Sequence, residues 1–205
     1  MESRLGILSS ESHIYKEQHT KGLELLSLME EELIGSHPER HITQAGRPEY
    51  TGCKVDFNIS HAKNLVICTM SEGKTGCDIE RSDRKVSIAI AEKFFHPEEK
   101  TFLEEAGNPR EKQRRFMMLW VLKEAHIKLL GTTVGAVRDT PSFSISGNRI
   151  LCQSSLFYSL YEGCCYVMAT AFERKTDRDN LIIRKYNDLP DFTLTAVNQA
   201  GEKIS

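Results

Sequence analysis

No apolar run in the 205-residue sequence approaches the ~20 residues that a membrane-spanning helix needs. The first residues, MESRLGILSSESH, lack the basic region and apolar stretch of a secretory signal peptide. The net charge of −2 gives no general attraction to nucleic acid. We therefore expect a cytoplasmic protein that binds neither membranes nor nucleic acid.

Clustered cysteines are also lacking, because no C-x-x-C spacing occurs among Cys53, Cys68, Cys77, Cys152, Cys164 and Cys165. This scatter excludes a four-cysteine zinc site and the disulfide framework of a small secreted protein. Five of the six lie in apolar or strand-like surroundings, where a free cysteine behaves as a small hydrophobe. We expect reduced, buried thiols.

Several catalytic signatures are absent as well. The sequence contains neither of the phosphate-binding loops G-x-x-x-x-G-K-[ST] and G-x-G-x-x-G, and it has no G-x-S-x-G nucleophile elbow. Nucleotide hydrolases built on those loops and serine hydrolases built on that elbow are therefore unsupported.

What the sequence does contain is a mixture of helical and strand-like periodicity, with 40% apolar and 27% charged residues. The helical spacing of Leu23, Leu26, Met29 and Leu33 predicts a first helix. Pro97 predicts the start of a later helix, and Gly131 predicts the end of the last and longest one. Helices are predicted at 15–34, 87–95, 97–107 and 108–131, and strands at 54–61, 64–71, 75–80 and in several segments after 143. From about Asn187 the sequence is polar and has no clear pattern.

This order of elements indicates an α+β fold. The turn S-E-G-K at 71–74 is a possible seam between an N-terminal subdomain, 1–74, and a C-terminal subdomain, 75–205. Both halves contain helices and strands, but no repeat at the level of residues is visible.

Two acids, Asp78 and Glu80, lie at the end of an apolar stretch in GCDIE. In an extended segment they point to one face, about 6–7 Å apart, while Cys77 and Ile79 point to the core. Such a pair binds a hard divalent cation like Mg²⁺, although an acidic pair on a strand is more often simply solvated.

The predicted long helix places Trp120, Glu124 and Lys128 on one face. Glu124 and Lys128 are i,i+4 neighbours and are typical of a surface ion pair. Leu119, Trp120 and Leu122 indicate that much of this helix is buried, and a buried acid needs a partner, such as a metal ion. Lys128 is then suited to binding a phosphate as a point charge.

The segment FNISH supplies Ser60 and His61 at a predicted strand end. The simplest interpretation of His61 is a loop histidine without a special partner. A histidine in this position is nevertheless able to donate a hydrogen bond to a phosphate.

Five segments, taken in order, resemble the 4′-phosphopantetheinyl transferase superfamily. They are GRP at 46–48, FNISH at 57–61, GCDIE at 76–80, FFHPEE at 94–99 and WVLKEAHIKLLG at 120–131. The length of the chain and the long segment before FNISH are similar to the larger, surfactin-synthetase-activating type. That type implies two similar α/β subdomains about a pseudo-two-fold axis in a monomer.

The resemblance implies a reaction in which a serine of an acyl or peptidyl carrier protein takes the phosphopantetheine of coenzyme A. It implies Asp78, Glu80 and Glu124 as Mg²⁺ ligands and Glu124 as the base for the serine proton. It also implies that Ser60, His61 and Lys128 hold phosphate oxygens, and that Arg47 contacts the nucleotide.

Cys77 replaces the usual Val or Ile of the family motif. The basic segment that grips the 3′-phosphate in larger members is matched here only by Lys16, His19 and Lys21. Two basic stretches with apolar anchors are candidates for docking an acidic carrier protein. The stretch 80–90 has Arg81, Arg84 and Lys85 beside Val86 and Ile88, and the stretch 109–118 has Arg110, Lys112, Arg114 and Arg115 with Met117 and Met118. Position next to the proposed metal site favours the first stretch.

Two other functions stay open. A non-catalytic relative would bind coenzyme A or a carrier protein without turnover, and the few basic residues near the N-terminus are compatible with it. An unrelated Mg²⁺ phosphohydrolase would release phosphate from nucleotides without a carrier protein.

Overall fold

The computed structural model describes residues 1–10, 15–86, 88–187, 189 and 191–199. The helices in these residues are α1 (Tyr15–Leu33), α2 (Ile88–Phe94), α3 (Pro97–Glu104), α4 (Pro109–Leu130), α5 (Lys175–Asp179) and the 3₁₀ helix η1 (Val134–Asp139). The strands are β1 (Arg4–Ser9), β2 (Arg40–Ile42), β3 (Pro48–Tyr50), β4 (Asp56–Ala62), β5 (Leu65–Ser71), β6 (Thr75–Arg81), β7 (Ser144–Ser146), β8 (Arg149–Leu151), β9 (Phe157–Gly163), β10 (Tyr166–Phe172), β11 (Ile182–Lys185) and β12 (Thr193–Val197). The α+β class predicted from the sequence is confirmed.

The strands of the described residues form two main sheets. The first has the order β11-β1-β5-β4, the second has the order β6-β10-β9-β12-β8-β7, and β2 pairs with β3 alone. Neighbouring strands are antiparallel, except that β11 is parallel to β1 and β12 is parallel to β8. The β4–β5 hairpin forms one edge of the first sheet, and the β9–β10 hairpin lies inside the second sheet.

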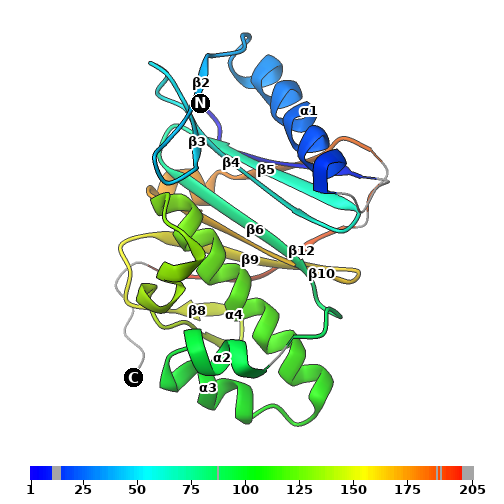
Figure 1. Cartoon of the computed structure of the whole chain (residues 1–205), viewed down its shortest axis with the longest axis vertical. Helices are drawn as coiled ribbons and strands as arrows, with labels where there is room; N and C mark the ends of the chain where they lie inside the picture. The colour runs from blue at the N-terminus through cyan, green and yellow to red at the C-terminus, as the bar shows by residue number, and fades with distance from the viewer. Residues whose placement is uncertain (11–14, 87, 188, 190, 200–205) are drawn as a thin grey trace.

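Each sheet carries one long helix, as Figure 1 shows, with β4, β5 and β6 between the two helices. Helix α1 packs on β1, β4 and β5 through Leu25, Leu26 and Met29, which are fully buried. Leu23, one of the residues whose spacing predicts this helix, is 39% exposed, because the buried face of α1 runs through Leu25 and Leu26. The two halves thus share an outline of one helix on a set of antiparallel strands.

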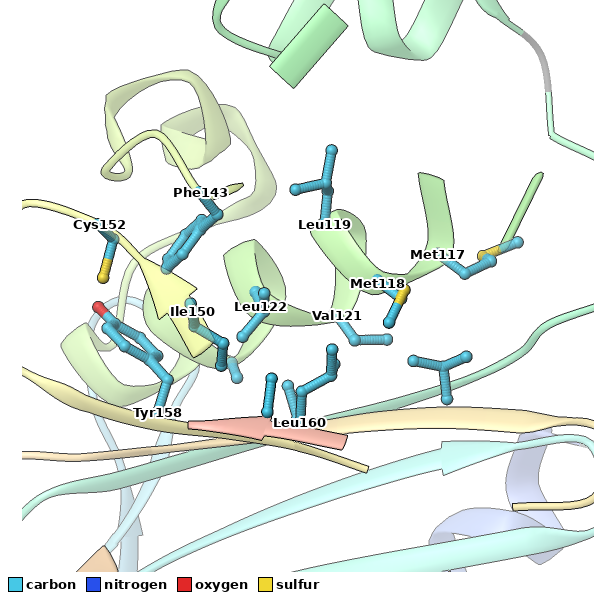
Figure 2. Close-up of a cluster of buried hydrophobic side chains, with 14 of the residues drawn as sticks. Met117, Met118, Leu119, Val121, Leu122, Phe143, Ile150, Cys152, Tyr158 and Leu160 are labelled. Carbon is cyan, nitrogen blue, oxygen red and sulfur yellow. The ribbon is translucent and has the colours of Figure 1, made fainter. Parts of the chain in front are cut away.

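Helix α4 covers β6, β9 and β10 and anchors the larger core. Figure 2 shows side chains of α4 such as Val121 and Leu122 pointing to the strand that carries Tyr158 and Leu160, while Leu119 points away from the strands. All of these residues belong to one cluster of buried side chains. Because both faces of α4 are covered, its position relative to β6 is fixed tightly.

The ends of α4 follow from its sequence. The side chain of Asn108 accepts a hydrogen bond from the backbone N–H of Glu111 at 2.9 Å, and Pro109 occupies the first turn. At the other end Gly131 has φ 68°, the left-handed conformation in which a helix commonly terminates.

The turn between β5 and β6, where the sequence predicts a seam, is also where the chain passes from the first sheet to the second. Strand β11 later returns to the first sheet and pairs with β1. Residues 182–185 therefore lie on the sheet of the N-terminal half, and a division at residue 74 into two subdomains stays a prediction.

None of the helices in the described part of the chain combines the length and the apolar character needed to cross a membrane.

Candidate active site

Strands β4 and β6, the edge strands of the two sheets, lie side by side and are joined by side chains. Asp56 Oδ2 accepts a hydrogen bond from the N–H of Thr75 at 2.8 Å, and Asn58 Oδ1 accepts one from the N–H of Cys77 at 3.0 Å. Both contacts join residues 19 apart in sequence, so the two strands run in the same direction. The side chains of Ser60 and Asp78 therefore lie close together at one end of the contact between β4 and β6, which is called the seam from here on.

Gly76 at the start of β6 allows α4 to approach the seam. A Cβ atom at this position would lie 2.2 Å from the carbonyl oxygen of Ala125 and 2.6 Å from the backbone nitrogen of Leu129. Only glycine fits under the helix backbone at such distances. This close approach brings the α4 residues Glu124 and Lys128 over the β6 acids.

Ser60, Asp78 and Lys128 form a hydrogen-bonded group across the seam. The Ser60 hydroxyl donates to Asp78 Oδ1 at 2.7 Å, and Lys128 Nζ donates to the same oxygen at 2.6 Å and to Ser60 Oγ at 2.9 Å. Asp78 and Ser60 are buried, and Lys128 is partly buried. Burial lowers the pKa of Lys128, but the attraction of Asp78, Cys77 and Glu124 and the hydrogen bond to Asp78 together outweigh it and raise the pKa, so the ammonium stays charged.

Glu80 lies one pleat further along β6, on the same face as Asp78. It accepts a hydrogen bond from the guanidinium of Arg84. Partial burial, and secondarily the charge of Asp78, raise the pKa of Glu80. Cys77 and Ile79 point to the opposite side and are buried in the core, as the alternation of a strand predicts.

Glu124 on α4 completes the acidic group and is its least satisfied member. Its side chain is 8% exposed, and no hydrogen bond or ion pair reaches it from the described residues. Burial, and then the charge of Asp78, raise the pKa of Glu124 to about 7. A buried carboxylate facing two other carboxylates is electrostatically unfavourable unless a cation or a proton joins it.

These three carboxylates fit a hard divalent cation by their chemistry, because such ions take oxygen ligands. Within residues 1–10, 15–86, 88–187, 189 and 191–199, however, no three acidic, histidine or cysteine side chains are gathered as closely as a finished metal site requires. Lys128 and Arg84 now neutralise Asp78 and Glu80. The side chains would therefore have to rearrange when a cation binds.

Histidines from α1 and β4 border the acidic group. His61 follows Ser60 on β4 and is half-buried, and its pKa is lowered, first by burial and then by the charge of Lys128. His19 on α1 is close enough to contribute to the same lowering. The sequence alone suggested His19 only as part of a weak basic segment, and the fold brings that segment to the β4 end of the seam.

Arg47 has a different environment from the one that the sequence predicts. Its Nε donates to the carbonyl of Lys128 at 2.9 Å, its Nη1 donates to Glu49 and Asp56, and its Nη2 donates to Asp56 and to the carbonyls of Phe57 and Thr75. All three guanidinium nitrogens are thus used within the protein, and a contact between Arg47 and the nucleotide stays a prediction. Arg47 instead joins α4, β4 and β6 at the site.

Lys123 and Glu99 were not assigned a contact from the sequence, yet they form a fully buried ion pair. Lys123 Nζ lies 2.9 Å from Glu99 Oε2, and both side chains are 0% exposed. Lys123 also donates to Thr140 Oγ1, and Glu99 accepts the N–H groups of His96 and Phe143. The signal in the sequence was a lysine within the apolar run LWVLKEA, which cannot reach solvent from a covered helix.

The two basic stretches also need correction. Met117 and Met118 are buried in the core, so they offer no apolar anchor to a partner. Arg114 and Arg115 pair with Glu111, and Arg114 also pairs with Glu162. In the other stretch Arg81 binds Asp83, Arg84 binds Glu80, and residue 87 and the side chain of residue 88 lie outside the described part of the chain.

Comparison with known proteins identifies the part of the chain that holds this site. The model of the 4′-phosphopantetheinyl transferase superfamily matches residues 74–171. These residues include β6, α4 and the hairpin β9–β10, and they contain Asp78, Glu80, Glu124 and Lys128. The resemblance inferred from the sequence motifs is thereby confirmed.

Similar proteins carry the same description. The 4′-phosphopantetheinyl transferase gsp of Aneurinibacillus migulanus is 37% identical over 104 residues, which are 51% of this chain and 42% of that protein. The 4′-phosphopantetheinyl transferase Sfp of Bacillus subtilis (strain 168) is 37% identical over 89 residues, 43% of this chain and 38% of that protein. The chain thus spans less than half of the length of these relatives.

Proposed function

We propose, from the premise that residues 74–171 belong to the 4′-phosphopantetheinyl transferase superfamily, that this protein transfers 4′-phosphopantetheine from coenzyme A to a carrier protein. The acceptor is a serine hydroxyl of an acyl or peptidyl carrier protein. The second product is adenosine 3′,5′-bisphosphate.

The observation that carries the proposal is the convergence of three acids and a lysine where the two sheets meet. Asp78 and Glu80 come from β6, and Glu124 and Lys128 come from α4. The buried Glu124 is hard to explain in a protein that only binds ligands, because burial and the charge of Asp78 outweigh the attraction of Lys128 and leave its carboxylate unfavourably placed.

Asp78, Glu80 and Glu124 would hold Mg²⁺. The ion would neutralise charge on the pyrophosphate of coenzyme A and on the leaving group. For this, Lys128 and Arg84 must release the carboxylates that they now contact, and both cations are then available for phosphate oxygens.

The chain's own residues supply positioning and proton transfer. The serine oxygen forms a bond to the β-phosphorus of coenzyme A while the bond from that phosphorus to the oxygen of adenosine 3′,5′-bisphosphate breaks. Glu124 takes the serine proton, directly or through a water molecule. Lys128, Ser60 and a neutral His61 with one N–H donor hold phosphate oxygens.

All of these side chains come from one chain, which supports an enzyme that is active as a monomer. Arg47 contributes by fixing α4 against β4 and β6.

The test is the mass of an apo acyl carrier protein after incubation with this protein, coenzyme A and Mg²⁺. We expect a gain of one phosphopantetheine that disappears when a chelator is added. A panel of peptidyl carrier proteins tests for a narrower acceptor range. Coenzyme A binding that needs no Mg²⁺, with no mass gain on any carrier, would favour a non-catalytic binding protein instead.

A further inference from the structure

The turn between β9 and β10 consists of two adjacent cysteines, Cys164 and Cys165. Gly163 and Tyr166 pair across the hairpin, so the two cysteines occupy its tip. Cys164 is exposed and Cys165 is half-buried, which corrects the expectation that the cysteines are buried. Their sulfur atoms are 3.8 Å apart.

The backbone at the tip is one that glycine adopts more easily than cysteine does. Cys164 has φ 52°, in the left-handed region, where a side chain costs about 1–2 kcal/mol. Lys63, at the tip of the β4–β5 hairpin, has a similar φ of 47°, as two-residue hairpin turns commonly require. The tip therefore carries an exposed thiol at a position where glycine would be more stable.

The hairpin tip borders a groove of about 860 Å³. The groove is also lined by Ser82 and Asp83 after β6 and by Arg110 and Arg114 at the start of α4. The N–H of Ser82 donates to the carbonyl of Cys165 at 2.8 Å. The dithiol is thus accessible from solvent and is fixed to the segment that directly follows Glu80.

The geometry of the pair favours chelation over a disulfide. Adjacent Cα atoms are about 3.8 Å apart across a trans peptide, and a disulfide usually requires about 4.4–6.8 Å. The described residues contain no cis peptide bond. A tetrahedral metal ion with metal–sulfur bonds of about 2.3 Å, by contrast, holds two sulfurs about 3.8 Å apart, the separation seen here.

We propose that Cys164 and Cys165 form an exchangeable binding site for a soft, tetrahedral metal ion of the Zn²⁺ and Cd²⁺ class. Two thiolates bind the ion, and water or another small ligand fills the remaining positions, because no third cysteine, histidine or acid joins the pair within the described residues. Soft thiolate ligands separate this site from the three carboxylates, which take hard ions.

The test is a titration of the reduced protein with Cd²⁺ in saturating Mg²⁺, followed by thiolate-to-metal charge-transfer absorption. A phosphine keeps the thiols reduced without adding a competing thiol. We expect one Cd²⁺ per chain and a loss of affinity of more than about tenfold when one thiolate is removed, since even outer-shell partners of a metal are worth that much.

Two variants and a control separate this site from the other cysteines. Cys164→Gly removes a thiol and relaxes the left-handed backbone, so it should fold at least as stably as the parent and lose the absorption. Cys165→Ser should lose it too, whereas Cys53→Ser, at a half-buried cysteine elsewhere, should keep it. An unchanged titration in Cys164→Gly, or a reduced parent protein without the absorption, would overturn the proposal.

Discussion

Asp78 is the residue on which the contacts of the site converge. One of its oxygens accepts hydrogen bonds from both Ser60 and Lys128, and its charge raises the pKa of both neighbouring glutamates, Glu80 and Glu124. A side chain that destabilises its neighbours in this way contributes more to binding a cation than to holding the fold. Removing the Asp78 carboxylate should therefore lower the transfer rate while changing the stability of the fold little.

The first prediction concerns Asp78→Ala. We expect it to lower the rate of phosphopantetheine transfer by at least about 100-fold, because loss of a metal ligand should exceed the loss of an outer-shell partner. The thermal midpoint should change little, because Lys128 keeps Ser60 and the nearby Glu124 as partners. The measurements are carrier-protein mass spectrometry over time and a thermal melt.

The control is Asp191→Ala, which removes an acid that is 93% exposed and pairs with Lys185 on the surface. It should leave both transfer and melting unchanged. Near-normal transfer by Asp78→Ala would show that Asp78 is not a metal ligand.

The second prediction concerns the buried pair of Lys123 and Glu99. Lys123→Met should destabilise the protein by about 3–5 kcal/mol, because it leaves a buried carboxylate without its cation. Adding Glu99→Gln should restore part of the lost stability, because the glutamine amide is uncharged and needs no buried cation beside it. Urea unfolding of both variants measures this, and a double variant less stable than Lys123→Met would contradict the explanation.

Short motifs in the sequence were sufficient to find the residues that the fold brings together at the seam. The site combines residues up to 68 positions apart, namely Ser60, Asp78, Glu80 and Lys128. Each of them lies in a short motif that indicates its chemical role from the sequence alone. The contacts of Arg47 with α4 and β6 could not be predicted from the sequence. They depend on carbonyl groups of distant strands and of α4, and the positions of these groups follow only from the packed structure.

At the scale of elements, the contact between β6 and α4 decides the geometry of the site. Gly76 lies directly beneath the backbone of Ala125 and Leu129, so the helix cannot move away from the strand without moving Glu124 and Lys128 as well. The same short motif, GCDIE, therefore contains both the glycine that admits the helix and the two acids that the helix covers.

The third prediction is that Gly76→Ala impairs both stability and transfer. The new methyl group must displace α4, and overpacking of this kind typically costs about 1–3 kcal/mol. Transfer should fall further than stability alone explains, because the carboxylate of Glu124 moves away from Asp78. Gly107→Ala is the matched control, since a Cβ there meets no atom within 4 Å. Equal activity of the two variants would refute this account.

The longer helices could be predicted from local signals, whereas the short helices α5 and η1 were missed. Asn108, Pro109 and Gly131 are local signals that define α4 from the sequence alone. The strands β1, β2, β3 and β12 were missed. Strands β2 and β3 are short, and β1 and β12 pair with strands that are distant in sequence. Strand β12 is held by β9 and β8, so the polar tail from which it comes had no pattern of its own to reveal it.

At the scale of the whole molecule, the two sheets are joined by side chains of β4. Asp56 and Asn58 accept backbone N–H groups of β6, and β11 returns from the second half to pair with β1. The proposed active site lies across this seam. Its geometry therefore requires that the two halves stay docked, and the halves should not unfold separately.

The last prediction is that both halves unfold at one urea concentration. Trp120 is the single tryptophan and reports on the second half by fluorescence, while Cys68, fully buried in the first sheet, reports by thiol labelling and mass spectrometry of its peptide. Asn58→Ala leaves the N–H of Cys77 without an acceptor and should lower both midpoints together, by about 1–3 kcal/mol in free energy of unfolding. Exposed Asn64→Ala is the control. Two separate midpoints in the parent protein would mean that the seam is too weak to hold the site, and that substrate binding must dock the halves.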